Sequence, residues 1–268
     1  DMPIRSIPLA AMDVPSLGQG TSGMGEDRRH RDREVRSLRL GLDLGMTLID
    51  TAEMYGDGGA EEVVGEALDG RRDECFLVSK VYPHNASRRL MARSCEASLR
   101  RLGTDAIDIL YLHKEDHATT LAETVGAMAD LVRAGKIRHF GVSNFRAWRV
   151  AEVCRLCDGL GVGRPVVSQP CYNALNRAPE VEHLPACAFY GVGVAPYSPL
   201  ARGVLTAKYR PGAPPPPDAA GTWPRVSRGS IRSRSRNSPQ RCAATKPAAM
   251  AAQSAAAKAS HQSAASPS

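Results

Sequence analysis

The sequence contains no long apolar run and few aromatic residues. Aromatic side chains make up 5% of the 268 residues, and no stretch approaches the roughly 18 consecutive apolar residues that a transmembrane helix needs. The beginning of the sequence also lacks a basic segment followed by an apolar one, so no secretory signal is expected. With 43% hydrophobic and 24% charged residues, the composition is typical of a globular protein. We therefore expect a cytoplasmic protein with no membrane segment.

Cysteine occurs without the pattern of a disulfide framework. The seven cysteines are an odd number and are scattered along the chain, which is typical of reduced intracellular thiols. Cys154 and Cys157 form a C-x-x-C pair, but the pair lies in a stretch with helical spacing and has no second pair to complete a zinc site. Two helix residues without a redox or metal role are the favoured interpretation, and no metal site is predicted.

Acidic residues are absent after Asp218. The formal net charge is +7, yet eight of the 35 basic residues and none of the 28 acidic residues follow Asp218, so the preceding part is close to neutral. A basic protein often binds nucleic acid through its phosphates. Here that interpretation concerns only residues 225–241, so nucleic acid is not expected as a partner of the rest of the chain.

The last part of the sequence has little that could form a core. It contains the prolines 214–217, the alternating arginines and serines 232–236 and an alanine- and serine-rich end. Between residues 219 and 268 the only branched aliphatic side chains are Val226 and Ile231. Such a segment buries too little apolar surface to offset its ordering entropy, so residues 213–268 are predicted to be a disordered tail. Its composition also suggests translation in a shifted reading frame, a hypothesis that the coding DNA would test.

Short apolar runs alternate with amphipathic stretches between about residues 16 and 200. The runs are rich in β-branched side chains and continuous, which suits strands covered on both faces. They lie at residues 47–49, 75–78, 107–112, 137–142, 166–167 and 192–195, and a further strand is predicted at residues 17–19. Apolar spacings of three and four predict helices at residues 31–44, 61–68, 89–102, 121–132 and 147–157. Glycines able to adopt a left-handed conformation end four of them, at Gly45, Gly70, Gly103 and Gly135.

Repeated strand–helix units predict an α/β fold with a parallel sheet. Seven strands are recognisable, whereas a closed (β/α)8 barrel of the TIM type has eight. We therefore predict an incomplete barrel of this type over residues 1–212, followed by the tail 213–268. A doubly wound sheet is the alternative at this level of evidence.

A glycine-rich segment invites a dinucleotide-binding interpretation of another kind. Residues 18–23 match G-x-G-x-x-G, and Asp43 follows about 20 residues later, as in a Rossmann fold. The context differs, because Pro15 is a poor residue for a central strand and the next helix begins only after the polar residues 26–32. The Rossmann interpretation is therefore disfavoured.

Titratable side chains follow three successive predicted strands. Asp50 and Tyr55 follow the second strand, Lys80 ends the third and His113 ends the fourth. In an α/β barrel the carboxyl ends of the strands open on one face, so these four groups would converge there. A single charge at a strand end is usually solvated, and His113 and Tyr55 could be structural residues. Four such groups on neighbouring strands favour a shared site.

Additional short motifs occur in the same order along the chain. They are residues 141–145 (GVSNF), Gln169 with Tyr172 and Asn173, and residues 197–200 (YSPL) with Gly203. Together with the four titratable residues, this ordered combination resembles the aldo-keto reductase family over roughly residues 5–210.

The resemblance implies a catalytic tetrad and an NADPH site. The tetrad would be Asp50, Tyr55, Lys80 and His113. Ser143, Asn144 and Gln169 would hold the carboxamide of the nicotinamide, and Tyr197 would stack on its ring. The cofactor site as a whole would include Gly20, Thr21, Asp50, Ser143, Asn144, Gln169, Tyr197, Ser198, Leu200 and Gly203.

This tetrad suits the reduction of a small aldehyde or ketone to an alcohol. Negative charge builds on the carbonyl oxygen as hydride arrives at its carbon, so a proton donor is needed, and Tyr55 would supply it. Tyrosine is a weak acid, and a nearby ammonium such as that of Lys80 stabilises its anion. Asp50 would keep Lys80 charged and oriented. Neutral His113 could donate a hydrogen bond to the carbonyl oxygen.

The chain departs from the family pattern after about residue 210. No eighth strand is recognisable there, and neither is the basic motif that binds the 2′-phosphate of NADPH. An alternative function is therefore a catalytically impaired, reductase-like scaffold that binds a nucleotide or a partner. Two smaller questions stay open: Ser143 and Asn144 could cap the following helix, and Tyr82, Phe145 and Trp148 could line a substrate pocket or only pack. The sequence does not indicate an oligomeric state.

Overall fold

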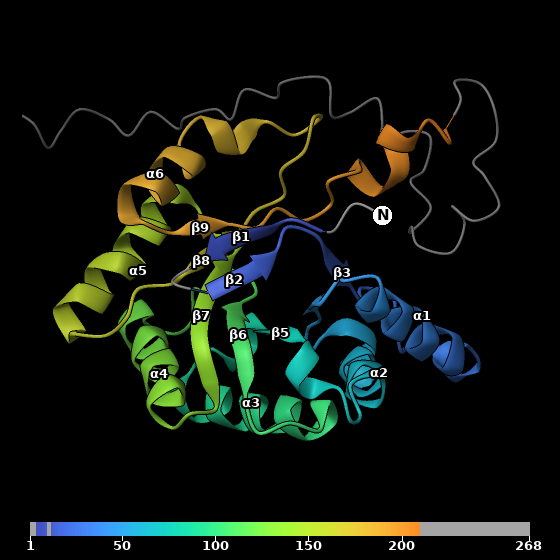
Figure 1. Ribbon diagram of the computed structural model, residues 1–268. Coiled ribbons are helices and arrows are strands. Elements are labelled where there is room, and N and C mark those ends of the chain that lie inside the picture. The colour runs from blue at the N-terminus through green and yellow to red at the C-terminus, as the bar shows by residue number, and fades with distance from the viewer. Residues whose placement is uncertain (1–3, 10–11, 210–268) are drawn as a thin grey trace, which may run out of the picture. The chain divides into compact units, whose positions relative to one another are not determined.

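The protein curls a parallel sheet inside a row of helices (Figure 1), as seen in a computed structural model that describes residues 4–9 and 12–209. Seven strands pair side by side in chain order, each parallel to the one before. This order is typical of a barrel, because in a doubly wound sheet the order of the strands in space reverses partway across the sheet. The strands are β3 (Gly18–Gly20), β4 (Leu48–Asp50), β5 (Phe76–Val81), β6 (Ile107–Leu112), β7 (Ile137–Ser143), β8 (Val167–Gln169) and β9 (Gly193–Val194).

Six α-helices connect or follow these strands and lie on the outer side of the sheet (Figure 1). The glycines predicted to end four of them, Gly45, Gly70, Gly103 and Gly135, all have positive φ angles. The helices are α1 (Arg31–Asp43), α2 (Gly59–Ala67), α3 (Arg88–Leu102), α4 (Leu121–Arg133), α5 (Ala147–Leu160) and α6 (His183–Tyr190). Short 3-10 turns lie at η1 (Arg28–His30), η2 (Tyr55–Gly58), η3 (Arg72–Glu74), η4 (Pro83–Asn85), η5 (Ala178–Glu180) and η6 (Ala201–Thr206).

The strands divide the core into two layers because successive side chains point to opposite faces of a sheet. Leu77 and Val81 of β5 point outward into the larger cluster beneath the helices. Val78 of β5 points inward, into a smaller cluster with Ile109 and Tyr111 of β6. Residues two positions beyond these inward-facing groups are therefore directed to the inside of the curl, at the carboxyl ends of the strands.

An antiparallel hairpin precedes the barrel strands. It consists of β1 (Ser6–Leu9) and β2 (Met12–Pro15), and the sequence analysis did not predict it. Leu9 packs against the inner cluster beside Phe76 and Val166, which lie at or just before the starts of their strands. The hairpin thus covers the amino ends of the strands, which leaves their carboxyl ends for the candidate site.

The incomplete-barrel prediction is confirmed for the part of the chain that the structure describes. Within residues 4–9 and 12–209, β3 and β9 stand at the two edges of the sheet and do not pair with each other. The predicted tail, residues 213–268, lies outside the described residues. Helix α6 was missed, and α2 begins two residues before its predicted start. None of the helices so described is long and apolar enough to cross a membrane.

The glycine-rich segment forms the first barrel strand and not a Rossmann turn. β3 pairs in parallel with β4, and η1 and a polar stretch separate it from α1, which begins only at Arg31. Gln19 fixes this strand to the helix by donating hydrogen bonds to the carbonyl oxygens of Leu38 at 3.1 Å and Met46 at 3.0 Å. The disfavoured Rossmann interpretation therefore has no support from the fold.

Candidate active site

Three polar side chains lie on the inward side of the sheet at the ends of neighbouring strands. Asp50 ends β4, Lys80 lies near the end of β5, and His113 directly follows β6. The alternation of the strands accounts for their direction, since Lys80 is two residues beyond inward-facing Val78 and His113 is two residues beyond inward-facing Tyr111. The register of the parallel pairs then brings the three groups together.

Lys80 is the centre of this group and is almost completely buried, at 1% exposure. Its ammonium forms a close ion pair with the carboxylate of Asp50 and donates a hydrogen bond of 2.9 Å to the carbonyl oxygen of Thr51. The phenolic oxygen of Tyr55 lies 3.5 Å from the same nitrogen. A buried ammonium requires such partners, because burial of an unpaired charge is strongly unfavourable.

Tyr55 lies between the rings and charges of the other residues. Its ring meets that of His113 edge-on, with centroids 5.8 Å apart and an interplanar angle of 83°. The Lys80 nitrogen lies 5.1 Å from the centre of the Tyr55 ring. All four predicted tetrad residues are therefore brought together by the fold.

His113 is held in its neutral form. The side chain is 7% exposed, and burial, together with the nearby positive charge of Lys80, lowers its pKa to about 4. Its main-chain oxygen accepts a hydrogen bond of 3.0 Å from the side-chain amide of Asn144. Within the described residues its ring makes no hydrogen bond, and the buried Nδ1 has no partner. A neutral imidazole next to Tyr55 can donate a hydrogen bond to a small ligand.

The residues expected to hold a nicotinamide form one hydrogen-bond network. Ser143 Oγ donates to the main-chain carbonyl oxygen of Gln169 at 2.9 Å, and the side-chain Nε2 of Gln169 donates to the carboxylate of Asp50 at 2.8 Å. Asn144 Nδ2 donates to Ser143 Oγ at 3.0 Å, and the Tyr197 hydroxyl donates to Asn144 Oδ1 at 2.8 Å. Hydrogen bonds thus join four of the predicted cofactor residues to one another and, through Asp50, to the tetrad.

Ser143 and Asn144 do not cap the following helix, so that alternative was wrong. The N-cap position of α5 is occupied by Arg146, whose side chain makes no capping hydrogen bond. Asn144 has a φ angle of 58°, in the left-handed region that asparagine tolerates better than most residues. This backbone turn directs the amide of Asn144 toward His113 and Tyr197 and away from the helix.

The remaining predicted cofactor residues lie at the two edges of the sheet. Gly20 ends β3, and its neighbour Thr21 is fully buried, with its hydroxyl 3.2 Å from the carbonyl oxygen of Asp50. Thr21 therefore fixes the main chain at Asp50. Ser198 and Leu200 lie between β9 and η6, and Gly203 lies within η6. Ser198 and Gly203 have positive φ angles, and Leu200 is exposed.

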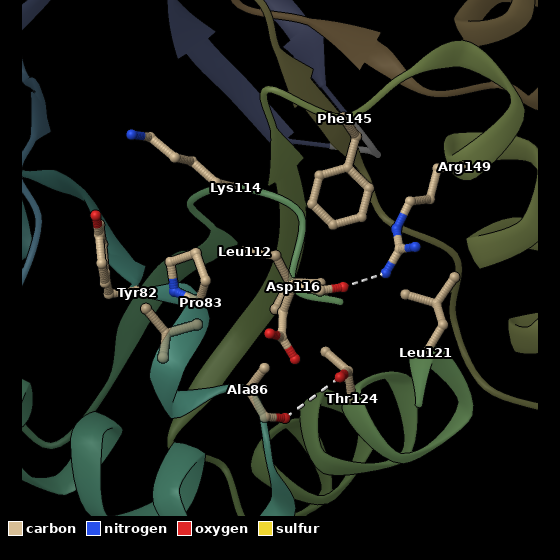
Figure 2. Close-up of a pocket in the computed structure, with 11 residues that line it drawn as sticks. Tyr82, Pro83, Ala86, Leu112, Lys114, Asp116, Leu121, Thr124, Phe145 and Arg149 are labelled. Carbon is tan, nitrogen blue, oxygen red and sulfur yellow. Dashed lines mark hydrogen bonds between the residues drawn. The ribbon is translucent and has the colours of Figure 1, made fainter. Parts of the chain in front are cut away.

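A small pocket lies among the loops that follow β5, β6 and β7 and the first turns of α4 and α5, and none of the four tetrad residues lines it (Figure 2). Tyr82 and Phe145 both line it, as does Lys114. The Tyr82 ring also meets His113 edge-on, with centroids 6.1 Å apart. Trp148, by contrast, is 59% exposed and is not among the pocket residues. Two of the three aromatic residues considered for a substrate pocket therefore line this cavity.

The buried cysteines and the acidic residues do not form a second site. Cys154 and Cys157 are completely buried in α5, where burial raises the pKa of the Cys157 thiol to about 12 and that of Cys154 to about 11. These thiols are poor nucleophiles in that state. Within residues 4–9 and 12–209, no cluster of histidine, cysteine, aspartate and glutamate could hold a metal ion. The structural interpretation of the C-x-x-C pair is the one that fits.

Glu53 was not predicted from the sequence. Its carboxylate accepts hydrogen bonds from the main-chain N–H of Tyr82 at 2.6 Å and from Asn85 Nδ2 at 2.9 Å, and it is in close hydrogen-bond contact with Ser94. No periodic pattern marks Glu53, since it lies in a loop between β4 and η2. Its proximity to Asp50 and Tyr55 in the sequence was the only available signal.

Comparison with known proteins identifies relatives along most of the chain. The chain is 48% identical, over 191 residues, to a methylglyoxal reductase (YeaE) of Escherichia coli (strain K12), a match that covers 71% of this chain and 66% of that protein. The chain spans 55% to 66% of the length of the curated relatives it matches.

Solved structures with the same fold include two from Klebsiella pneumoniae. An aldo/keto reductase in complex with NADP and acetate superposes with a TM-score of 0.68 at 47% identity, over 72% of this chain and 67% of that one. An aldo-keto reductase in complex with NADPH superposes with a TM-score of 0.70 at 45% identity, over 75% and 70% of the two chains. The model of the Aldo/keto reductase family matches residues 16–264, and the chain belongs to this family.

Proposed function

We propose that this chain reduces small aldehydes or ketones to alcohols with NADPH, and that Tyr55 donates the proton. The observation that carries the proposal is the position of the Lys80 ammonium, which lies 3.5 Å from the Tyr55 hydroxyl and is paired with Asp50. A cation at this place stabilises the phenolate that remains when Tyr55 gives up its proton. The relatives support the same chemistry, since one is a methylglyoxal reductase and two were solved with NADP or NADPH.

The network around Asn144 fits the nicotinamide end of the cofactor. A carboxamide both donates and accepts hydrogen bonds, and the side chains of Ser143, Asn144 and Gln169 can do both as well. Tyr197 places an aromatic ring beside this set through its 2.8 Å hydrogen bond to Asn144. When bound there, NADPH supplies the hydride that reduces the carbonyl carbon. Gly20, Ser198, Leu200 and Gly203 would line the rest of the cofactor.

The protein residues supply the proton and orient the carbonyl group. Neutral His113, which has no hydrogen-bond partner for its ring among the described residues, would donate a hydrogen bond to the carbonyl oxygen. Tyr55 would transfer its hydroxyl proton to the same oxygen as negative charge builds on it. Lys80 would stabilise the phenolate, and Asp50 would hold Lys80 in place. Tyr55 regains a proton from water after the alcohol leaves.

Turnover of a small dicarbonyl tests the proposal. NADPH oxidation is followed in the presence of methylglyoxal, chosen because of the relative that reduces it, and nicotinamide fluorescence measures cofactor binding separately. We expect aldehyde-dependent oxidation that falls by about 100-fold or more in Tyr55→Phe, the range that one general acid contributes, while the variant still binds NADPH. Tyr190→Phe, which removes a hydroxyl at the end of α6, away from the tetrad, is the matched control. Cofactor binding without turnover in the unmodified chain would favour the alternative of a non-catalytic scaffold.

A further inference from the structure

The segment that carries Tyr55 continues into a left-handed turn that includes one residue other than glycine, Asp57. Directly after Tyr55, three consecutive residues have left-handed φ angles: 56° at Gly56, 52° at Asp57 and 94° at Gly58. Such conformations persist only where the surroundings hold them, above all at a residue with a side chain such as Asp57. At Gly56 a Cβ atom would lie 2.9 Å from the carbonyl oxygen of Met24, so this turn is already packed closely on one side.

Glu53 holds the same segment from the other side. Its carboxylate bonds to three separate parts of the chain: the N–H of Tyr82 after β5, Asn85 in η4, and Ser94 in α3. Ser94 is buried, and Glu53 itself is partly buried, so these contacts lie largely away from solvent. Hydrogen bonds to a carboxylate are among the stronger ones in proteins. Glu53 therefore ties the loop before Tyr55 to the end of the strand that carries Lys80.

The main chain repeats this connection. The N–H of Glu53 faces the carbonyl oxygen of Lys80 at 3.3 Å, and the Lys80 ammonium donates to the carbonyl oxygen of Thr51 at 2.9 Å. The side chain of Glu53 bonds to the N–H of Tyr82, whose ring packs on His113. A movement of Glu53 would thus disturb the contacts that set the separation of Tyr55 from Lys80.

We propose that Glu53 is a positioning residue that keeps the Tyr55 hydroxyl within reach of the Lys80 ammonium. The inference rests on the proposed function, because it assigns Glu53 to the same proton-transfer step. The Glu53 carboxylate makes no hydrogen bond to the Tyr55 hydroxyl or the Lys80 ammonium among the described residues. It acts through the distance between these two groups.

Two variants of Glu53 separate positioning from simple stabilisation. Glu53→Ala removes all three acceptor contacts and is expected to lower kcat by about 100-fold, the effect of a misplacement near 1 Å. KM for methylglyoxal and the Kd for NADPH should stay within about 2-fold of their original values, because the Glu53 carboxylate is occupied by its bonds to Tyr82, Asn85 and Ser94. Glu53→Gln should retain most of kcat, since its oxygen can accept from Tyr82 and Asn85 while its amide donates to Ser94.

Matched controls guard against effects of folding. Glu62→Ala removes a half-exposed carboxylate that pairs with Arg31 on the helical surface, and it should leave kcat unchanged. If Glu53→Ala does not fold, Ser94→Ala and Asn85→Ala each remove one contact and should each lower kcat several-fold. A Glu53→Ala protein that folds and keeps its kcat, or loses kcat only in proportion to its unfolded fraction, would overturn the inference.

A second readout does not depend on turnover. In a crystal structure of Glu53→Ala, the separation between the Tyr55 hydroxyl and the Lys80 nitrogen is compared with its 3.5 Å value. Glu53→Ala should lengthen this separation by about 1 Å, the misplacement that corresponds to the expected loss of kcat. An unchanged separation overturns the inference even if the chain turns over no aldehyde. Absence of turnover with a lengthened separation would refute the proposed function alone.

Discussion

Gln169 donates a hydrogen bond of 2.8 Å from its side-chain amide to the carboxylate of Asp50, although the two residues are 119 positions apart. They come from β8 and β4, which are not neighbours in the sheet, so the bond crosses the inside of the curl. The other oxygen of Asp50 pairs with Lys80. Asp50 therefore links the proton-transfer group to the residues proposed to hold the nicotinamide.

Loss of this bond should weaken cofactor binding. Gln169→Leu keeps a side chain of similar size but removes the donor, and a hydrogen bond to a charged group contributes about 1.5 to 3 kcal/mol. We expect the Kd for NADPH to rise by about 10-fold or more, measured by nicotinamide fluorescence. Gln169→Glu should weaken binding further, because it places a second carboxylate against Asp50. An unaltered Kd in both variants would remove Gln169 from the cofactor site.

Removal of the buried ammonium should affect stability and activity together. Lys80→Met leaves the Asp50 carboxylate without its ion-pair partner, and the breaking of a buried pair costs about 3 kcal/mol or more of unfolding free energy. Asp50 is 19% exposed and keeps the bond from Gln169, so the lower end of that range is expected. Urea denaturation measures this loss, and NADPH oxidation should fall close to that of Tyr55→Phe.

The double variant Lys80→Met with Asp50→Asn separates the two effects. Neutralising Asp50 removes the uncompensated charge, so unfolding free energy should recover in large part. Activity should not recover, because no cation remains beside Tyr55 to stabilise its anion. Recovery of turnover along with stability would show that Lys80 serves only the fold.

His113 should make stability depend on pH. Its pKa is lowered from 6.5 to about 4 by burial and by the charge of Lys80, so below pH 6.5 the unfolded chain takes up a proton that the folded chain does not. The contribution of His113 to the unfolding free energy is then constant above about pH 6.5. It declines by roughly 3 kcal/mol as pH falls toward 4.

A variant that cannot titrate isolates this contribution. His113→Phe keeps an aromatic ring against Tyr55 and Tyr82 but binds no proton. Unfolding free energy is measured by urea denaturation at several pH values. As pH falls from 6.5 to 4, the unmodified protein should lose stability relative to His113→Phe. A difference that stays constant over this range would contradict a lowered pKa for His113.

A second buried carboxylate gives a test of stability away from the proposed chemistry. Glu61 of α2 is fully buried and pairs with Arg101 of α3 at 2.6 Å, and Ser79 also donates to it at 2.6 Å. Arg101→Met keeps much of the side-chain volume but leaves Glu61 without its charged partner, which should lower unfolding free energy by about 3 kcal/mol. Arg100→Met, at the neighbouring exposed position, should change it by less than about 0.5 kcal/mol. Equal effects of the two substitutions would contradict the assignment.

Local patterns in the sequence determine much of the secondary structure of this protein. The apolar runs located six of the seven barrel strands, because a strand covered on both faces is apolar along most of its length, whereas β3 is a short and largely exposed Gly-Gln-Gly segment. The helical spacings located five of the six helices, and glycines marked where four of them end. Helix α6 was missed because it is short and has no clear apolar stripe among its residues. The motifs at Asp50, Tyr55, Lys80 and His113 indicated the family and the four side chains that the fold brings together.

Only the tertiary structure decided how these residues act on one another. The bond from Gln169 to Asp50 and the three contacts of Glu53 join segments that no local period relates, so neither could be derived from spacing. The lowered pKa of His113 depends on burial and on the distance to Lys80, which are properties of the packed chain. Secondary structure follows from interactions between near neighbours in sequence, whereas the electrostatics of a site sum over every group that folding brings close.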